Sequence, residues 1–256
     1  MIAADLALAL DPVRLAERAG LAPDPWQADV LRSNDRQTIL LCSRQSGKST
    51  VSAVMAVHEA AYRDAALVLL LSPSLRQSQE LFRKALDTYH TMGNATSPSA
   101  ESKLTLELDN GSRIVSLPGK EATIRGFSGV TLLVVDEASR VPDDLYMSIR
   151  PMIAVSGGRI VLLSTPFGKR GFFHKEWTSG GPGWQRVQVP AHDCPRIPAA
   201  WLAAERERIG QWWFSQEYGC EFVDNDDQVF ASDLIEGSLS TDVAPLFAVF
   251  RPEVAA

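Results

Sequence analysis

The sequence TILLCSRQSGKST, residues 38–50, decides the fold of this chain. Its apolar run, residues 38–42, predicts a buried strand, and the small residues from Val51 onward predict a helix. A loop between a strand and a helix can point its backbone N–H groups at an anion, and the positive end of the helix dipole adds to the attraction. The sequence therefore predicts a phosphate-binding loop, formed by Ser43, Arg44, Gln45, Ser46, Gly47, Lys48, Ser49 and Thr50.

Two side chains of this loop suit a nucleoside triphosphate and its metal ion. Lys48 is placed to reach the β- and γ-phosphates, and Ser49 to ligate Mg²⁺. The full glycine-rich pattern has a glycine six residues before the lysine, where this chain has Cys42. The alternative is that Gly47 only ends a strand and that Lys48 is a solvated lysine. The loop alone leaves both interpretations open.

A second apolar run, residues 132–135, ends in the paired carboxylates Asp136 and Glu137. It is too short for most helices and predicts a buried parallel strand. In nucleotide hydrolases such a strand lies beside the phosphate loop. There Asp136 can hold the Mg²⁺ shell, and Glu137 can orient or deprotonate the attacking water. The alternative for Asp136 is a helix N-cap. Together with the loop, the two acids predict a nucleotide hydrolase.

The composition fits one large α/β domain or two small ones. The chain has 256 residues, of which 45% are hydrophobic, enough for a substantial core. Its net charge of -6 excludes a uniformly basic nucleic-acid-binding monomer, so any grip on DNA must be local. The densest basic and aromatic cluster, residues 169–175, is one candidate for that grip. The alternative is a solvated loop with a small aromatic anchor.

Several function classes are not favoured by the sequence. No run reaches the length of a membrane span, and no Lys or Arg precedes residues 6–10, unlike a secretory signal. Cys42, Cys194 and Cys220 are too scattered for a disulfide framework and predict buried thiols. His192 and its neighbours lack a second ligand pair, so we expect no structural metal. We expect a soluble, intracellular protein.

Periodicity and turn residues predict strands that alternate with helices. Asp11 and Asp24, each before a proline, open short helices, and Ser74 opens a longer one that ends at Gly93. Residues 104–117 predict a hairpin. Further strands are predicted at residues 67–71, 159–163 and 185–189, and helices at 51–62, 198–209 and 212–218. This alternation indicates an α/β fold with a mainly parallel central sheet flanked by helices.

Motifs along the chain, taken in order, resemble those of one known family, the ATPase domain of the large terminase subunit, the DNA-packaging motor of tailed phages. The motifs are Trp26-Gln27, Arg44-Gln45-Ser46-Gly47-Lys48-Ser49, Thr123-Ile124-Arg125-Gly126, Val135-Asp136-Glu137-Ala138, Ile149-Arg150-Pro151-Met152, Leu163-Ser164-Thr165-Pro166-Phe167-Gly168 and Gln216-Glu217-Tyr218. They span nearly the whole chain, and together they are specific although no single one is. The resemblance implies a P-loop NTPase fold of the ASCE type with a small C-terminal helical subdomain.

The predicted domain boundaries follow from these elements and motifs. Residues 1–36 are a helical lead-in with the adenine-side motif, 37–190 the ATPase core and 191–223 a helical lid. Residues 224–256 are a linker or tail that contains Asp224, Asp226, Asp227 and Asp233. A full large subunit resembles this chain plus a ribonuclease H-type nuclease, and the tail is too short to build one. We therefore expect no nuclease activity.

The resemblance also implies roles for particular residues. Gln27 contacts adenine, and Trp26 serves the ligand, the core or both. Arg44 neutralises phosphate charge from within the subunit and is typical of terminases that lack the full glycine pattern. Arg125 resembles an arginine finger presented across a subunit boundary. Arg140 is a third candidate by proximity. The alternative for each of the three arginines is a surface or helix-cap salt bridge, which we favour for Arg140 but not for Arg44 or Arg125.

The implied function is Mg²⁺-dependent ATP hydrolysis that drives double-stranded DNA into a viral procapsid. Ser164 and Thr165 would couple the γ-phosphate to movement of a neighbouring subdomain; the alternative is a helix N-cap or Ser/Thr turn. The resemblance implies a homo-oligomeric ring, a portal and a small terminase subunit as partners, no membrane, and the cytoplasm of the infected host cell. A superfamily-2 helicase fragment and a nucleotide-locked assembly protein with little turnover remain the alternatives.

Overall fold

The structure is a computed structural model that describes residues 2–93, 96–119, 126–224 and 237–238. It divides into two compact units, residues 1–223 and residues 224–256. Of the second unit only Asp224, Gly237 and Ser238 are described. The predicted tail, with Asp226, Asp227 and Asp233, thus lies almost entirely outside the described residues.

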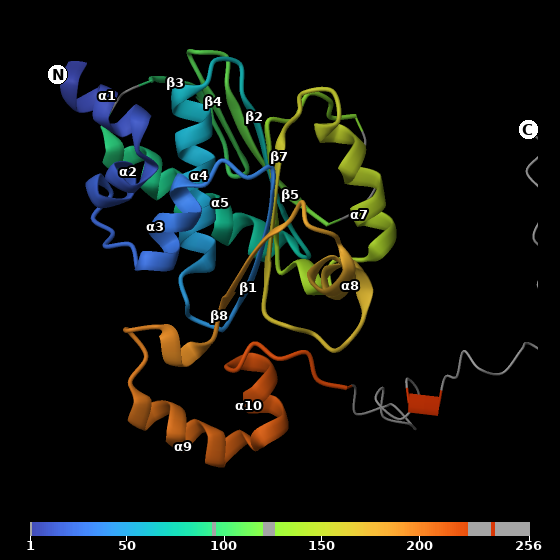
Figure 1. The fold of residues 1–256 in the computed structure, drawn as a ribbon. Helices are drawn as coiled ribbons and strands as arrows, with labels where there is room; N and C mark the ends of the chain where they lie inside the picture. The colour runs from blue at the N-terminus through green and yellow to red at the C-terminus, as the bar shows by residue number, and fades with distance from the viewer. Residues whose placement is uncertain (1, 94–95, 120–125, 225–236, 239–256) are drawn as a thin grey trace, which may run out of the picture. The chain divides into compact units, whose positions relative to one another are not determined.

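An eight-stranded sheet forms the centre of the first unit (Figure 1). The strand order is β3-β4-β5-β2-β6-β7-β1-β8. The pairs from β5 to β8 are all parallel, and β3, β4 and β5 pair antiparallel. This mainly parallel sheet confirms the predicted α/β class. The strands are β1 Gln37–Cys42, β2 Leu67–Ser72, β3 Pro98–Glu101, β4 Thr105–Leu108, β5 Arg113–Pro118, β6 Leu132–Asp136, β7 Arg159–Ser164 and β8 Gln185–Val189.

Helices cover both faces of the sheet (Figure 1). One face is covered by α1 Ile2–Leu10, α2 Pro12–Arg18, α3 Pro25–Arg32, α4 Lys48–Tyr62 and α5 Leu75–Met92, and the other by α7 Asp143–Ile149 and α8 Gly171–Ser179. A second helical pair, α9 Ala199–Ile209 and α10 Gln211–Glu217, follows β8. Single-turn 3₁₀ helices occur at η1 Ala138–Arg140, η2 Arg150–Ile153 and η3 Ala191–Asp193.

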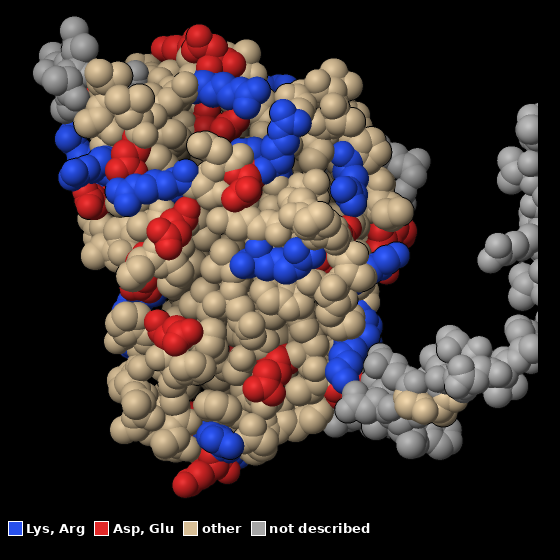
Figure 2. Space-filling view, in the orientation of Figure 1, with Lys and Arg blue, Asp and Glu red and all other residues tan. Residues whose placement is uncertain are grey.

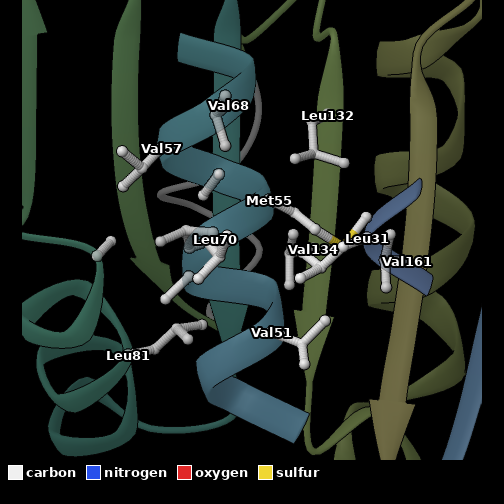
Figure 3. Packing of buried hydrophobic residues seen from close by; sticks show 14 of the residues in the cluster. Leu31, Val51, Met55, Val57, Val68, Leu70, Leu81, Leu132, Val134 and Val161 are labelled. Atoms are coloured by element: carbon white, nitrogen blue, oxygen red, sulfur yellow. The ribbon is translucent and has the colours of Figure 1, made fainter. Parts of the chain in front are cut away.

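The core consists of two layers, because successive strand side chains point to opposite faces of the sheet. Leu70, Val134 and Val161 belong to the layer under α4, whereas their neighbours along the same strands belong to the other. Figure 3 shows Val51 and Met55 of α4 beside Val134 and Val161. Burying an aliphatic side chain of this size contributes about 1.5–3 kcal/mol, so this layer fixes α4, and with it the loop that precedes α4.

The order of the strands shows how the acidic strand comes to lie beside the phosphate loop, as the sequence predicts. The acidic strand β6 is not the neighbour of β1, because β7 lies between them. Both strands still end at the same edge of the sheet, since β6, β7 and β1 run parallel. The residues after β6 and after β1 therefore remain within reach of each other.

The sequence analysis missed β3, α1, α7 and α8. Strand β3 is exposed at all four residues and begins with a proline, so it has no hydrophobic alternation to detect. Helix α8 contains much of the basic and aromatic cluster. Its Phe172 and Phe173 are buried, and the ring of Tyr146 stacks on Phe172 with centroids 3.9 Å apart. The aromatic anchor of the alternative is therefore present, on a helix and not on a solvated loop, and contact of this cluster with DNA stays a prediction.

Among the described residues there is neither a membrane-spanning helix nor a cluster of metal-ligating side chains. Within them, no helix combines the length and the apolar character that a bilayer crossing requires. Nor do His, Cys, Asp and Glu side chains gather there in groups of three or more that could hold a metal ion. All three cysteines are free and buried, as the sequence predicted.

Candidate nucleotide site

The phosphate loop is held in place by the edge strand and by its own backbone conformation. The N–H of Ser43 donates to the carbonyl of Val189 in β8 at 2.9 Å. Gly47 has a φ of +91°, and a Cβ there would lie 2.6 Å from Nε2 of Gln27. A side chain at this position would therefore meet both a strained backbone and a collision. Helix α4 begins directly after it, at Lys48.

Cys42, where the full pattern has glycine, belongs to the strand rather than to the loop. It is the last residue of β1 and is fully buried. Burial raises the pKa of its thiol to about 12, so the side chain stays neutral and acts as a small core residue. The turn itself does not begin until Ser43, and the glycine is not needed for it.

The lysine-bearing loop and the paired acids meet at the end of the sheet. The hydroxyl of Ser49 donates to Oδ2 of Asp136 at 3.3 Å. Nζ of Lys48 lies 3.6 Å from Oε1 of Glu137. Four residues from two segments far apart in the sequence thus form one cluster around the N-terminus of α4.

Asp136 and Ser49 form a donor set that suits Mg²⁺. Both offer oxygen atoms, which this hard cation prefers, and P-loop enzymes complete its shell with phosphate and water oxygens. Asp136 is 7% exposed. Burial, and next the charge of Glu137, raise the pKa of the Asp136 carboxyl to about 6. A bound cation would offset this unfavourable burial of charge and supply positive charge to the phosphates.

We expect Asp136→Asn to stabilise the nucleotide-free protein at high pH. The pKa of Asp136 rises from 3.8 to about 6 on folding, so between these values the folded protein binds more protons than the unfolded chain. Stability from this group is therefore complete below pH 4 and falls as the pH rises through 6. The variant should lack this loss, which is about 2–3 kcal/mol.

The measurement is the free energy of unfolding in urea at pH 4 and pH 8, with a metal chelator present. The wild type should lose more stability than Asp136→Asn between the two pH values. Asp64→Asn, a change at an exposed carboxylate, is the matched control and should follow the wild type. Equal pH dependence in all three proteins would contradict the predicted burial cost.

Glu137 occupies an unusual backbone conformation directly after β6. Its φ is 49° and its ψ is 42°, in the left-handed region that a residue with a long side chain rarely adopts. Strain of this kind is concentrated at functional sites. The turn aims the carboxylate at the loop, where Oε1 faces Lys48 and Oε2 lies 4.0 Å from Nε of Arg140.

Glu217, at the end of α10, is a site residue that the sequence analysis did not assign. Its side chain is mostly buried and forms a salt bridge with Arg44, whose backbone N–H also donates to the Glu217 carbonyl at 3.2 Å. Nη2 of Arg140 lies 3.9 Å from the same carboxylate. The predicted salt bridge of Arg140 thus exists, but its partners are two carboxylates of the site. The only sequence signal was the Gln216-Glu217-Tyr218 motif.

A chain of hydroxyl contacts leads away from Glu137 toward β7. The Ser139 hydroxyl donates to the carbonyl of Thr165 at 2.9 Å and lies 2.6 Å from the Ser164 hydroxyl. Because Ser139 has one proton to donate, Ser164 must donate to Ser139. Helix α8 begins only at Gly171, so neither Ser164 nor Thr165 is its N-cap. The N-cap part of that alternative is wrong, whereas the Ser/Thr turn stays an open alternative.

A pocket of about 280 Å³ lies beside the phosphate loop on the side of α3. Gln27 lines it, donating through Nε2 to the Ser46 carbonyl at 3.2 Å and accepting through Oε1 from the Asp24 N–H at 2.9 Å. Trp26 is half-buried and packs against the core, and it does not line this pocket. The other lining residues are Ala16, Gly20, Leu21, Ala22, Pro23, Leu31, Gly47, Thr50, Val51, Val54 and Arg196.

The predicted arginine finger lies outside the described residues. Thr123, Ile124 and Arg125 all belong to this part of the chain. Gly126, the last residue of that motif, is described and exposed. The position of Arg125 relative to the site therefore stays a prediction.

The sheet, the glycine-lysine loop before α4 and the acids after β6 define a P-loop NTPase fold. The chain belongs to the family described as "Terminase large subunit, T4likevirus-type, N-terminal", whose model matches residues 39–236. The resemblance seen in the sequence is thereby confirmed.

Relatives and solved structures agree with this family. The chain is 26% identical over 251 residues to the "Terminase, large subunit" of Thermus phage G20c and of Thermus virus P23-45, covering 84% of this chain and 52% of each relative. It thus spans about half the length of the curated relatives it matches. The large terminase ATPase domain of Thermus phage P74-26 has a TM-score of 0.73 and 22% identity, over 81% of this chain and 97% of that domain. The large terminase of another thermophilic bacteriophage, in complex with ADP, has a TM-score of 0.62 and 12% identity, over 86% and 53%.

Proposed function

We propose that this chain hydrolyses MgATP and that hydrolysis drives double-stranded DNA into a viral procapsid. The observation that carries the proposal is the meeting of Lys48 and Ser49 with Asp136 and Glu137 in a member of the terminase family. Each of these four residues has the chemistry that phosphoryl transfer to water requires. The adjacent pocket, lined by Gln27, offers a place for the base.

The surroundings of the site residues support the following proposed roles. Ser49 and Asp136 hold the metal ion, and Lys48 neutralises charge on the β- and γ-phosphates. Glu137, which remains partly exposed, orients or deprotonates the attacking water. Arg44, already at the loop, offsets the charge that develops as the γ-phosphoryl group leaves. Ser164 and Thr165, linked to the Glu137 turn through Ser139, pass the state of the site to the rest of the core.

The lid is proposed to follow the nucleotide through α10. Residues 191–223 include α9 and α10, and Glu217 of α10 forms a salt bridge with the loop arginine. A phosphate that attracts Arg44 competes with Glu217 for it. Nucleotide binding would therefore alter the contact between lid and core, which is the motion that a DNA-moving subunit needs.

The proposed DNA contact is electrostatic and local. On the face drawn in Figure 2, basic and acidic side chains of the described residues are interspersed rather than gathered in one basic band. A grip through phosphates should be salt-sensitive and largely indifferent to sequence. We propose that such a grip forms in a homo-oligomeric ring that works with a portal and a small terminase subunit in the cytoplasm of the host cell.

The test is steady-state phosphate release by the chain with ATP and Mg²⁺, together with a tailed DNA duplex that reports strand separation. A packaging ATPase should release phosphate in a Mg²⁺-dependent manner and leave the duplex paired. Strand separation would favour a helicase. Negligible turnover that does not depend on Glu137 would favour a nucleotide-locked assembly protein.

We predict that Arg125 acts on the site of a neighbouring subunit. Arg125→Ala should then lower hydrolysis by about 10³-fold or more, the range for an arginine finger. A mixture of Arg125→Ala with Lys48→Ala should recover part of the activity. At some interfaces an Arg125→Ala subunit supplies an intact Lys48, and its Lys48→Ala neighbour supplies an intact Arg125. The measurement is phosphate release at several mixing ratios, and no recovery at any ratio would remove the assignment in trans.

A further inference from the structure

Arg196 joins three segments that are far apart in the sequence. It lies between η3 and α9, on the segment that leads into the second helical pair. Its Nη1 donates to Oδ1 of Asp24 at 2.8 Å, and its Nη2 donates to the carbonyl of Ser46 at 2.9 Å. One side chain thus ties the start of α3 and the phosphate loop to the lid.

The same guanidinium lines the pocket beside the phosphate loop. It shares this pocket with Gln27 and with apolar residues such as Leu21, Val51 and Val54. The Arg196 side chain remains 47% exposed although two of its donors are engaged. A guanidinium has five N–H donors and a planar face that stacks on aromatic rings. The remaining N–H donors of Arg196 and the planar face of its guanidinium are therefore accessible to a ligand.

The lining suits the nucleoside part of a nucleotide better than its phosphates. Apolar walls with a few fixed polar groups are typical of pockets for a flat aromatic ligand. Gln27 is held by bonds at both ends of its amide, to Asp24 and to Ser46. The positive charge of Arg196 is partly balanced by the carboxylate of Asp24. The chemistry here favours a base with a π face and ribose oxygens.

We propose that Arg196 binds the nucleoside of the substrate triphosphate and so makes the lid sensitive to the base. The proposal rests on the proposed ATPase function. Asp24 is the positioning residue for Arg196, because its mostly buried carboxylate holds the guanidinium at the rim of the pocket. A ligand in the pocket would then contact, through Arg196, the segment that leads into α9.

The experiment compares two ligands that share a triphosphate but differ in the nucleoside. ATP and inorganic tripolyphosphate, each with Mg²⁺, are titrated by calorimetry into the wild type and into Arg196→Ala. We expect the dissociation constant for ATP to rise about tenfold, the size expected for one desolvated cation–π contact. The constant for tripolyphosphate should stay within about twofold, because Lys48 is unchanged and the Ser46 carbonyl still accepts a hydrogen bond from Gln27.

Kinetics and a control variant separate this role from a structural one. In Arg196→Ala the KM for ATP should rise about tenfold while kcat changes less than about twofold, as expected for loss of uniform binding. Arg208→Ala removes an arginine of α9 that pairs with Glu205 on the same helix, and it should behave as the wild type. Arg196→Lys keeps the charge but loses the planar face, and it should recover less than half of the lost affinity.

Several outcomes would overturn the proposal. If the affinities for ATP and for tripolyphosphate fall by the same factor, Arg196 supports the loop through Ser46 and does not bind the nucleoside. If neither affinity falls, the Arg196 side chain is not needed for binding of either ligand. Should Arg196→Ala unfold because Asp24 is left without its partner, the neutral pair Asp24→Asn with Arg196→Gln gives the same test. Wild-type protein that binds neither ligand would refute the ATPase function itself, whereas intact ATP preference in an active variant refutes only the role of Arg196.

Discussion

Replacing Glu137 with glutamine is expected to lower the steady-state rate of ATP hydrolysis at least about a hundredfold, while ATP still binds. Glutamine has nearly the shape of glutamate but cannot accept a proton from water. Its oxygen can still face Lys48, which lies 3.6 Å from Oε1 of Glu137. The phosphate loop keeps its own contacts with β8 and Gln27. The loss should therefore fall on kcat.

The two quantities are measured separately, by phosphate release and by calorimetric titration of ATP with Mg²⁺. Glu80→Gln is the matched control, because Glu80 is an exposed carboxylate paired with Arg83 on α5, away from the site. It should hydrolyse ATP like the wild type. If Glu137→Gln retains more than about a tenth of the wild-type rate, Glu137 is not the residue that activates water.

The sequence predicted the centre of the site because its signals are local. The loop before α4 and the acids after β6 each lie within a few residues of a buried strand, and an apolar run with a polar end is visible without any tertiary information. Parallel strands then bring these ends to the same edge of the sheet. The insertion of β7 between β1 and β6 had no such signal, since strand order depends on packing.

The periphery of the site could not be predicted in the same way. Glu217 reaches Arg44 across 173 residues, and Arg196 reaches Ser46 across 150. Glu217 belongs to the Gln216-Glu217-Tyr218 motif, but that motif does not show which residue Glu217 contacts, and no motif includes Arg196. The contacts of Glu217 and Arg196 depend on how α10 and the segment before α9 pack on the rest of the unit, which is a property of the whole fold.

The cationic side chains of the candidate site lie beside carboxylates of the same site. Lys48 faces Glu137, and Arg44 and Arg140 face Glu217. Each cation that a triphosphate needs is thus already near a carboxylate. In the proposed function a nucleotide would exchange these contacts for its own, and the carboxylates released in this way would become available to the metal ion, to water and to movement of α9 and α10.

Replacing Lys48 with methionine is accordingly expected to weaken ATP binding at least about thirtyfold, because loss of one partner of a buried charge pair costs about 2–5 kcal/mol. Lys48 is 8% exposed, so its ammonium interacts in a medium that screens little. Methionine fills a similar volume, which separates the lost charge from a lost side chain. Calorimetric titration of ATP with Mg²⁺ measures the effect, and Lys175→Met, a change at an exposed lysine of α8, is the control.

The same variant should also lose stability without nucleotide, since Glu137 then keeps its charge without its ammonium partner. Adding Glu137→Gln to Lys48→Met removes that charge and should restore part of the lost free energy of unfolding, about 1 kcal/mol for a mostly buried pair. ATP binding should not return with it. The double variant would thereby separate stability from ATP affinity. Stability depends on the charges of Lys48 and Glu137 being matched, whereas ATP affinity depends on the Lys48 ammonium. Recovery of affinity in the double variant would mean that the lysine acts only by neutralising Glu137.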